Sequence, residues 1–299
     1  MNKQIRMLTS EDFPYLEAMD TGIEDDYVVR IFHSLTTENH RLYGLFIDGQ
    51  MASMGGYTIF AERYAMLGRL RSDRRFRGNN LATQLISYIM NQAFQVDGIQ
   101  WVGANTQEYN IPARRVVEKL RLKPYVMLHG AVTKDTSALE TGAKPWKHID
   151  SIERKKQWLK EVYLKSSSVF PYECYYSFPA SKELFCNEDI EKWSFYENEE
   201  KTRVLITKYD QKKDHYLHVV YPWSDMLSQK GLWETIAKDY RKLKEQVEGD
   251  TYIWIDLTKE EAQSLPENHQ FELPSPWILY GVEKENYNLV DEIKLSSSF

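Results

Sequence analysis

A short polar segment, Arg77-Gly78-Asn79-Asn80-Leu81-Ala82, has residue types suited to holding an anion. It lies between a predicted strand at 64–72 and a predicted helix at 81–94, whose apolar residues recur at helical spacing. The first amides of a helix have no partner inside it, and the helix dipole adds about half a positive charge there. Gly78 lets the backbone approach a ligand closely, Asn80 tolerates left-handed backbone angles, and Ala82 leaves room over the first turn. The segment therefore predicts a phosphate or diphosphate site.

The elements that must position this segment alternate between strand and helix patterns. Asp48-Gly49 is a strong hairpin signal between two of the strands, and Pro112 suits the first turn of a helix that carries apolar residues to 120. The other helices are expected at 9–19, 25–35 and 81–94, and the strands at 5–8, 41–47, 51–60, 64–72, 99–104 and 125–132. This alternation predicts a sheet covered by helices.

Two segments in this order resemble motifs of the GNAT superfamily of N-acetyltransferases. The family's phosphate loop has the form Arg/Gln-x-x-Gly-x-Gly/Ala. Arg77 and Ala82 match its two ends, and Gly78 matches the glycine commonly found after the arginine, whereas Asn80 stands in the middle glycine position. The family's next helix begins with Asn-x-x-Ala and ends in a Glu-Lys-Leu-Gly-Phe-like stretch. Here that helix reads Asn110-Ile-Pro-Ala113, followed by Glu118-Lys119-Leu120-Arg121-Leu122. The resemblance covers residues 1–135.

The resemblance implies an α/β (α+β) fold, with a mixed, largely antiparallel sheet flanked by helices. It also implies direct transfer of acetyl from acetyl-coenzyme A, as cosubstrate, to an amine, with no metal. The residues it implies for coenzyme binding are Leu70, Ser72, Arg75, Arg77, Gly78, Asn79, Asn80, Leu81, Ala82, Asn105, Asn110 and Ala113.

The sequence identifies the catalytic acid and base less clearly than the residues for coenzyme binding. The family's general acid is often a tyrosine just before Glu-Lys, and this sequence has Val117 there, so Tyr125 is the candidate substitute. A general base must take a proton from the amine, and the stretch 68–72 contains no carboxylate. The candidate bases are Glu24, Asp25, Asp26, Glu62 and Glu108, each with a solvated surface acid as the alternative interpretation.

Two rival functions stay open. One is transfer of a different acyl group from its coenzyme A ester. The other, motivated by Val117 and Asn80, is an acyl-coenzyme A-binding or regulatory protein whose catalysis is weak or lost.

The second half predicts another α/β domain. The polar stretch 133–147 predicts a linker, which gives domains at 1–135 and 150–299. Helices are expected at 152–164 and 232–247, and strands at 203–207, 215–221, 252–257 and 277–282. The order strand, strand, helix, strand, strand resembles the end of the first domain, so a degenerate GNAT-like repeat is an alternative.

Composition excludes other classes of function. The 299 residues carry a net charge of -6, and an acidic chain is a poor general binder of nucleic acid, although five arginines lie within 69–77. Cys174 and Cys186 have no zinc-ligand spacing. No segment is typical of a signal peptide or a membrane span, so we expect a cytoplasmic protein. The expected partner is a small-molecule or peptide amine, and a homodimer stays open.

Overall fold

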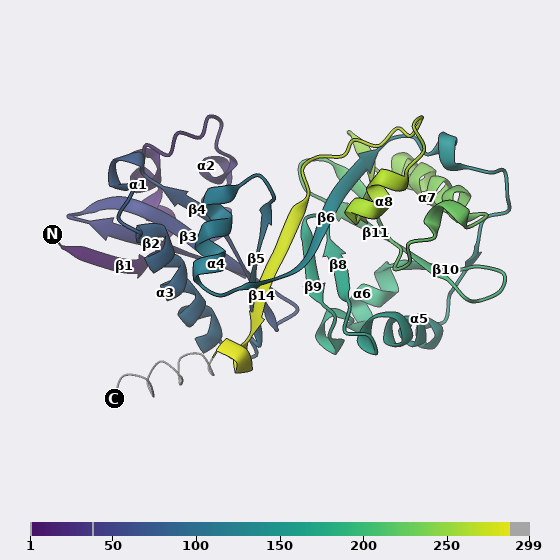
Figure 1. Cartoon of the computed structure of the whole chain (residues 1–299), viewed down its shortest axis with the longest axis horizontal. Coiled ribbons are helices and arrows are strands. Elements are labelled where there is room, and N and C mark those ends of the chain that lie inside the picture. The colour runs from purple at the N-terminus through teal and green to yellow at the C-terminus, as the bar shows by residue number, and fades with distance from the viewer. Residues whose placement is uncertain (1, 38, 288–299) are drawn as a thin grey trace. The chain divides into compact units, whose positions relative to one another are not determined.

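In the computed structural model, which describes residues 2–37 and 39–287, the elements follow the order that the sequence predicts for the first domain (Figure 1). The strands of this part are β1 (Lys3–Met7), β2 (His40–Ile47), β3 (Gln50–Phe60), β4 (Tyr64–Ser72), β5 (Trp101–Gln107) and β6 (Lys123–Thr133). The helices are η1 (Ser10–Asp12), α1 (Phe13–Glu17), α2 (Tyr27–Ile31), η2 (Ser34–Thr36), η3 (Arg74–Phe76), α3 (Leu81–Gln95) and α4 (Ile111–Lys119). The predicted mixed α/β fold is therefore confirmed.

The second part of the chain contains more elements than the sequence predicted. Its strands are β7 (Lys147–His148), β8 (Val169–Glu173), β9 (Tyr176–Pro179), β10 (Ser194–Glu197), β11 (Val204–Gln211), β12 (His215–Val220), β13 (Thr251–Leu257) and β14 (Trp277–Glu283). Its helices are η4 (Ser137–Leu139), α5 (Ile152–Leu159), the π-helical η5 (Lys160–Leu164), η6 (Lys182–Leu184), α6 (Asn187–Lys192), η7 (Met226–Ser228), α7 (Leu232–Gln246) and α8 (Lys259–Ser264).

The chain divides into two compact units whose boundaries differ from the expected ones. The first unit is Met1–Tyr125 together with Leu279–Phe299, and the second is Val126–Ile278. The break therefore lies inside β6 rather than in the polar stretch 133–147, because β6 continues as a strand of the second unit's sheet. Residues 288–299, which the expected second domain included, lie outside the described residues, as do residues 1 and 38.

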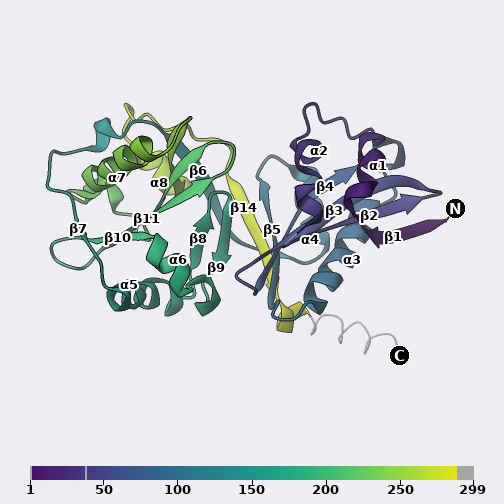
Figure 2. The same cartoon turned by 180° about the vertical axis from the view of Figure 1, so that it is seen from behind.

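The sheet of the first unit has the order β1-β2-β3-β4-β5-β14. The pairs from β1 to β4 are antiparallel, and β4 pairs with β5 in parallel. Met54 of β3 belongs to the core under α1 and α2, whereas a side chain at the next residue, Gly55, would meet Ile86 and Ile89 of α3. Because successive residues of a strand point to opposite faces, α1 and α2 cover one face and α3 covers the other (Figures 1 and 2).

The second unit repeats this strand pattern. Its sheet has the order β6-β13-β12-β11-β10-β7, in which β10, β11 and β12 are antiparallel neighbours and β12 pairs with β13 in parallel. The 15-residue helix α7 connects β12 to β13, as the 15-residue α3 connects β4 to β5. The core of this unit lies between α7 and the apolar face of the sheet, and includes Leu217, Ile236 and Ile253.

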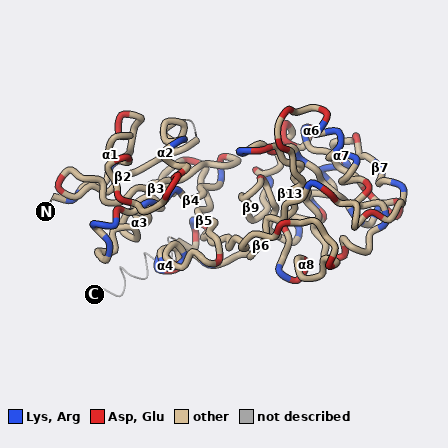
Figure 3. The backbone as a smooth tube through the Cα atoms, turned by 90° about the horizontal axis from the view of Figure 1, so that it is seen from above, with Lys and Arg blue, Asp and Glu red and all other residues tan. Residues whose placement is uncertain are grey.

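Basic and acidic positions are interspersed along both units (Figure 3). No helix in the described ranges 2–37 and 39–287 is long and apolar enough to cross a bilayer. In those same ranges, no group of three His, Cys, Asp or Glu side chains is arranged to hold a metal ion.

Candidate active site

The segment predicted to bind an anion forms the turn between η3 and α3. Gly78 and Asn80 both have left-handed backbones, with φ of 87° and 56°, and α3 begins at the next residue. No side chain caps this helix start. Among the described residues, none accepts a hydrogen bond from the backbone amides of residues 78–83. The turn therefore presents a set of open backbone donors, which is the arrangement that binds a diphosphate.

A buried carboxylate, that of Asp73, holds the residues just before this turn by hydrogen bonds. Asp73 is fully buried and accepts hydrogen bonds from the backbone amide and the Nε of Arg75, both at 2.9 Å. The hydrogen bonds from Arg75 hold the pKa of the Asp73 carboxyl below its usual value. Arg75 also donates to the carbonyl of Ala18. Arg75 therefore stabilises the base of the turn, whereas Arg77 is exposed and makes no ion pair within the part of the chain that the structure describes.

Beside the turn, β4 and β5 stop pairing. They pair in parallel from Tyr64 and Trp101 to Leu67 and Ala104, although β4 runs on to residue 72 and β5 to residue 107. On its other side β4 carries a bulge, since Gly55 of β3 lies opposite two β4 residues, 69 and 70. The parallel ladder between the two strands therefore ends at Leu67 and Ala104, before the last residues of either strand.

Helix α4 begins and ends near this opening. The Asn110 side chain accepts a hydrogen bond from the amide of Ala113 at 3.3 Å and so caps the helix start. At the other end, the Lys119 Nζ donates to the Asn80 side-chain oxygen at 3.1 Å, which ties α4 to the turn. Val117, in the position where the resemblance expects a tyrosine, is buried.

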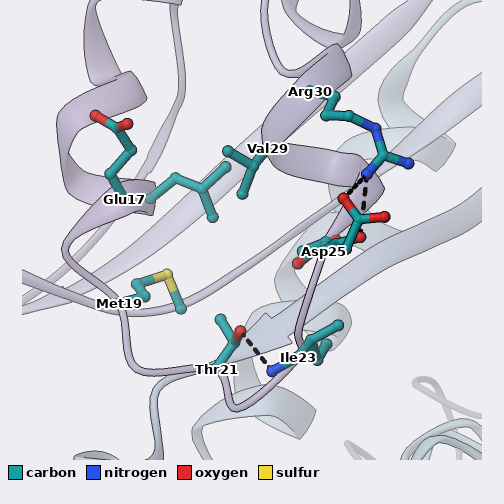
Figure 4. A pocket seen from close by; sticks show the side chains of 9 residues that line it. Glu17, Met19, Thr21, Ile23, Asp25, Val29 and Arg30 are labelled. Carbon is teal, nitrogen blue, oxygen red and sulfur yellow. Dashed lines mark hydrogen bonds and ion pairs between the residues drawn. The ribbon is translucent and has the colours of Figure 1, made fainter.

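A pocket of about 380 Å³ opens among α1, α2 and the segment between them (Figure 4). Asp25 pairs with the exposed Arg30 at its rim, and Glu24 is exposed and does not line it. The pocket is lined by Leu16, Glu17, Met19, Thr21, Ile23, Asp25, Asp26, Val29 and Arg30.

The back of this pocket is tied to β4 by a buried ion pair. The two Asp26 oxygens accept from Arg71 Nε and Nη2 at 2.5 and 2.7 Å. Burial opposes ionisation of Asp26, but the hydrogen bonds from Arg71 and from the amide of Val28 outweigh it and hold the pKa of the carboxyl below its usual value. Arg71 follows the β4 bulge, so this pair fixes α2 against the strand whose edge opens toward β5.

Residues 3–121 match the model of the Acetyltransferase (GNAT) family. This segment is a GNAT domain. A GCN5-related N-acetyltransferase from Sphaerobacter thermophilus is 14% identical, with a TM-score of 0.54 over 94% of this chain and 95% of that one. A proposed acetyltransferase from Thermoplasma acidophilum is 15% identical, with a TM-score of 0.51 over 92% and 91%. At such identities the likeness concerns the fold, and it extends over both units. Among curated proteins no significant match was found.

The GNAT domain gathers most of the residues that the sequence implied for coenzyme binding. The turn and first helical residues, 77–82, form the open donor set described above. Leu70 and Ser72 lie on the part of β4 beyond its pairing with β5, and Asn105 lies on the corresponding part of β5. Ala113 lies in the first turn of α4. The side chains of Arg75 and Asn110 are bonded within the protein, so their contribution is to hold the backbone.

Two of the candidate catalytic residues lie away from this opening. Tyr125 packs edge-on against Trp101, with ring centroids 6.1 Å apart, where β4 and β5 are still paired. Trp101 is the first residue of β5, at the opposite end of that strand from Asn105. Glu62 lies in the turn before β4, at the opposite end of that strand from the phosphate turn. These positions could not be predicted from distance along the sequence.

In the second unit, the start of α7 corresponds to the start of α3, but other residues of the chain cover it. Gly231, with φ of 80°, precedes α7 as Asn80 precedes α3, but a side chain there would lie 2.2 Å from the carbonyl of Lys144. The Glu234 carboxylate, in the first turn of α7, accepts hydrogen bonds from the backbone amides of Thr141 and Ala143. A buried indole, Trp233, stands where α3 has Ala82. A negative charge and filled space therefore replace the anion site of the GNAT domain.

Sequence reasoning missed two groups on the α1–α2 face of the first sheet. One is the Asp26–Arg71 pair. The other joins three strands, since Arg69 Nη1 donates to Thr58 Oγ1 at 2.6 Å and His40 Nδ1 lies 2.8 Å from the same oxygen. The alternation of Arg69 and Arg71 was visible in the sequence, but the bulge between them changes the register and could not be predicted from spacing.

Proposed function

We propose that the protein transfers an acetyl group from acetyl-coenzyme A to an amine. The observation that carries this proposal is the turn at residues 77–82, whose open amides follow the part of β4 that lies beyond its parallel pairing with β5. A diphosphate bound at the turn would leave the extended pantetheine arm to run alongside that part of β4. The family match supports acyl transfer as the class of chemistry. Acetyl-coenzyme A supplies the acetyl thioester when bound.

In the proposed reaction the acceptor first loses a proton and becomes a neutral amine. Its nitrogen attacks the thioester carbonyl carbon, a C–N bond forms, the C–S bond breaks, and the departing thiolate takes up a proton. We assign stabilisation of the oxyanion to backbone amides at the β4 bulge, where the regular ladder with β3 is interrupted. Asp25, at the pocket rim, is the carboxylate that we retain as proton acceptor.

Buried Val117 favours a second candidate, a protein that binds an acyl-coenzyme A without fast turnover. Release of free thiol from acetyl-coenzyme A, measured over a panel of amines, separates the two. Acetyl transfer predicts thiol release that depends on the amine and saturates with both substrates. Coenzyme binding measured in parallel, without release for any amine, would favour the second candidate.

A further inference from the structure

The guanidinium of Arg69 is a half-buried charge that is bonded to a neutral group. It lies at the β4 bulge, where its backbone has a φ of 56°, and it donates to the hydroxyl of Thr58. Thr58 is 6% exposed, so this hydrogen bond lies within the α1–α2 face of the sheet rather than in solvent. Its hydroxyl also meets His40. The three side chains form a polar line across β2, β3 and β4.

Seven other arginines of the first unit are matched by carboxylates. The pairs are Arg6–Asp12, Arg30–Asp25, Arg63–Glu283, Arg71–Asp26, Arg74–Asp20, Arg75–Asp73 and Arg114–Glu118. Over residues 2–37 and 39–287, no carboxylate oxygen lies within 4.0 Å of Arg69. A charge that is partly removed from water is unfavourable without an opposite charge nearby. Arg69 is therefore suited to receive a carboxylate from outside the chain.

The space next to Arg69 is open. A side-chain carbon at Gly68 would meet no other atom within 4 Å. Gly68 lies opposite Gly56, and Met66 lies opposite Thr58, so the open position shares a sheet face with the Arg69–Thr58 bond. Gly68 is also the first residue of β4 beyond its pairing with β5. An acceptor that reaches a thioester at this opening passes within reach of the guanidinium.

We propose that the acceptor amine carries a carboxylate, which Arg69 binds, so that the substrate belongs to the class of amino acids. This proposal rests on the proposed acetyl transfer. A planar guanidinium binds a carboxylate through two parallel hydrogen bonds, which fixes the orientation of the molecule as well as its affinity. The carboxylate would thereby orient the amino group toward the thioester.

The pocket of Figure 4 makes the opposite prediction. Glu17 and Asp25 line it, and these carboxylates would favour a polyamine without any acidic group. We favour the amino-carboxylate because Asp25 already pairs with Arg30, whereas Arg69 has no such counter-charge among the described side chains.

The test compares matched acceptors on the full chain with acetyl-coenzyme A: a set of amino acids, their carboxamides, the corresponding amines without the carboxyl group, and a polyamine. We expect kcat/KM for the best amino acid to exceed that for its carboxamide by at least about tenfold, because a buried polar site left unpaired rejects the analogue. Arg69→Gln should remove this preference by raising KM for the amino acid, with little effect on the carboxamide. Arg69→Lys should restore part of it.

Arg241→Gln, an exposed arginine of the second unit, is the matched control and should leave the preference unchanged. The rise in melting temperature on adding coenzyme shows whether Arg69→Gln is folded. Equal or faster turnover of amines without a carboxylate, or an equal loss for all acceptors in Arg69→Gln, overturns the inference while acetyl transfer stands. Thiol release that no acceptor of any class increases overturns the proposed function and the inference with it.

Discussion

The buried pair of Asp26 and Arg71 is the residue-scale contact that joins the pocket to the central sheet. Their side chains are 5% and 12% exposed, so either partner alone would be left as a buried charge. Breaking such a pair by removing one charge is destabilising by about 3 kcal/mol. We predict that Asp26→Asn lowers the free energy of unfolding by about that amount at neutral pH, measured by urea denaturation.

The effect of Asp26→Asn on the free energy of unfolding should depend on pH, because the pKa of Asp26 is lowered in the folded protein. Because its pKa is lower in the folded than in the unfolded protein, the pair stabilises the fold above the usual value of 3.8, and the stabilisation is lost as the pH falls through the folded value. Asp26→Asn should therefore cost less at acid than at neutral pH. Asp25→Asn is the matched control, because the Asp25 side chain is 87% exposed and its pair with Arg30 is screened by water. Equal losses in both variants would contradict this account.

A second residue-scale prediction concerns Arg121, which follows α4 with a left-handed φ of 62°. The family has glycine at this position, and a residue with a side chain pays about 1 kcal/mol there. Arg121→Gly should therefore stabilise the GNAT domain by about that amount, measured by thermal unfolding. Arg115→Gly, in the exposed interior of α4, should destabilise it by about 1 kcal/mol. If both variants are destabilised alike, the left-handed cap is not under strain.

At the scale of elements, β14 completes the first sheet from far along the chain. Trp101 of β5 lies against Gly281 of this strand, where a side-chain carbon would come within 2.2 Å of the indole. Overfilling a packed core is destabilising by about 1–3 kcal/mol. We predict that Gly281→Val lowers the melting temperature of the first unit and weakens coenzyme binding indirectly. Gly68→Ala, where the added carbon meets nothing within 4 Å, is the stability control. An unchanged melting temperature in Gly281→Val would mean that β14 does not support this sheet.

Local patterns predicted the elements well where one face is apolar. The strand expected at 64–72 is β4, and the helix expected at 81–94 is α3, because periodicity and the polar turn before the helix are both local signals. The hairpin of β8 and β9 was missed, since its aromatic residues carry no simple alternation. The strand at 277–282 was found, but its neighbour was not, because pairing across more than a hundred residues leaves no local trace.

Within the candidate site, too, only the features that are local in the sequence could be predicted. The phosphate turn was predictable because Gly78, Asn80 and the helix start are adjacent in the sequence. Arg69 and Thr58 lie on different strands, and a bulge sets their contact, so only the structure reveals it. Tyr125 was proposed as an acid from sequence position alone, and the structure adds that its ring packs against Trp101 at the start of β5.

At the scale of the whole molecule, two units share a strand pattern but only one has an open helix start. The α7 start holds Glu234 and is covered by residues 141–146, whereas the α3 start has six amides without an acceptor among the described residues. The account therefore predicts one coenzyme site per chain. It also assigns that site to the first unit, where a single change in the first turn of α3 should abolish it.

Calorimetric titration of the full chain with acetyl-coenzyme A tests most directly whether each chain has one coenzyme site at the start of α3. The protein should bind one equivalent, and at a hundred times the dissociation constant the coenzyme should raise the free energy of unfolding by about 2.7 kcal/mol. Ala82→Glu, which adds bulk and negative charge beside the open amides, should lose both effects, and Ala82→Gln should retain more binding than Ala82→Glu. Gln95→Glu places the same charge at the far end of α3 and should bind like the parent. Full binding by Ala82→Glu, two equivalents per chain, or no binding by the parent would contradict the account.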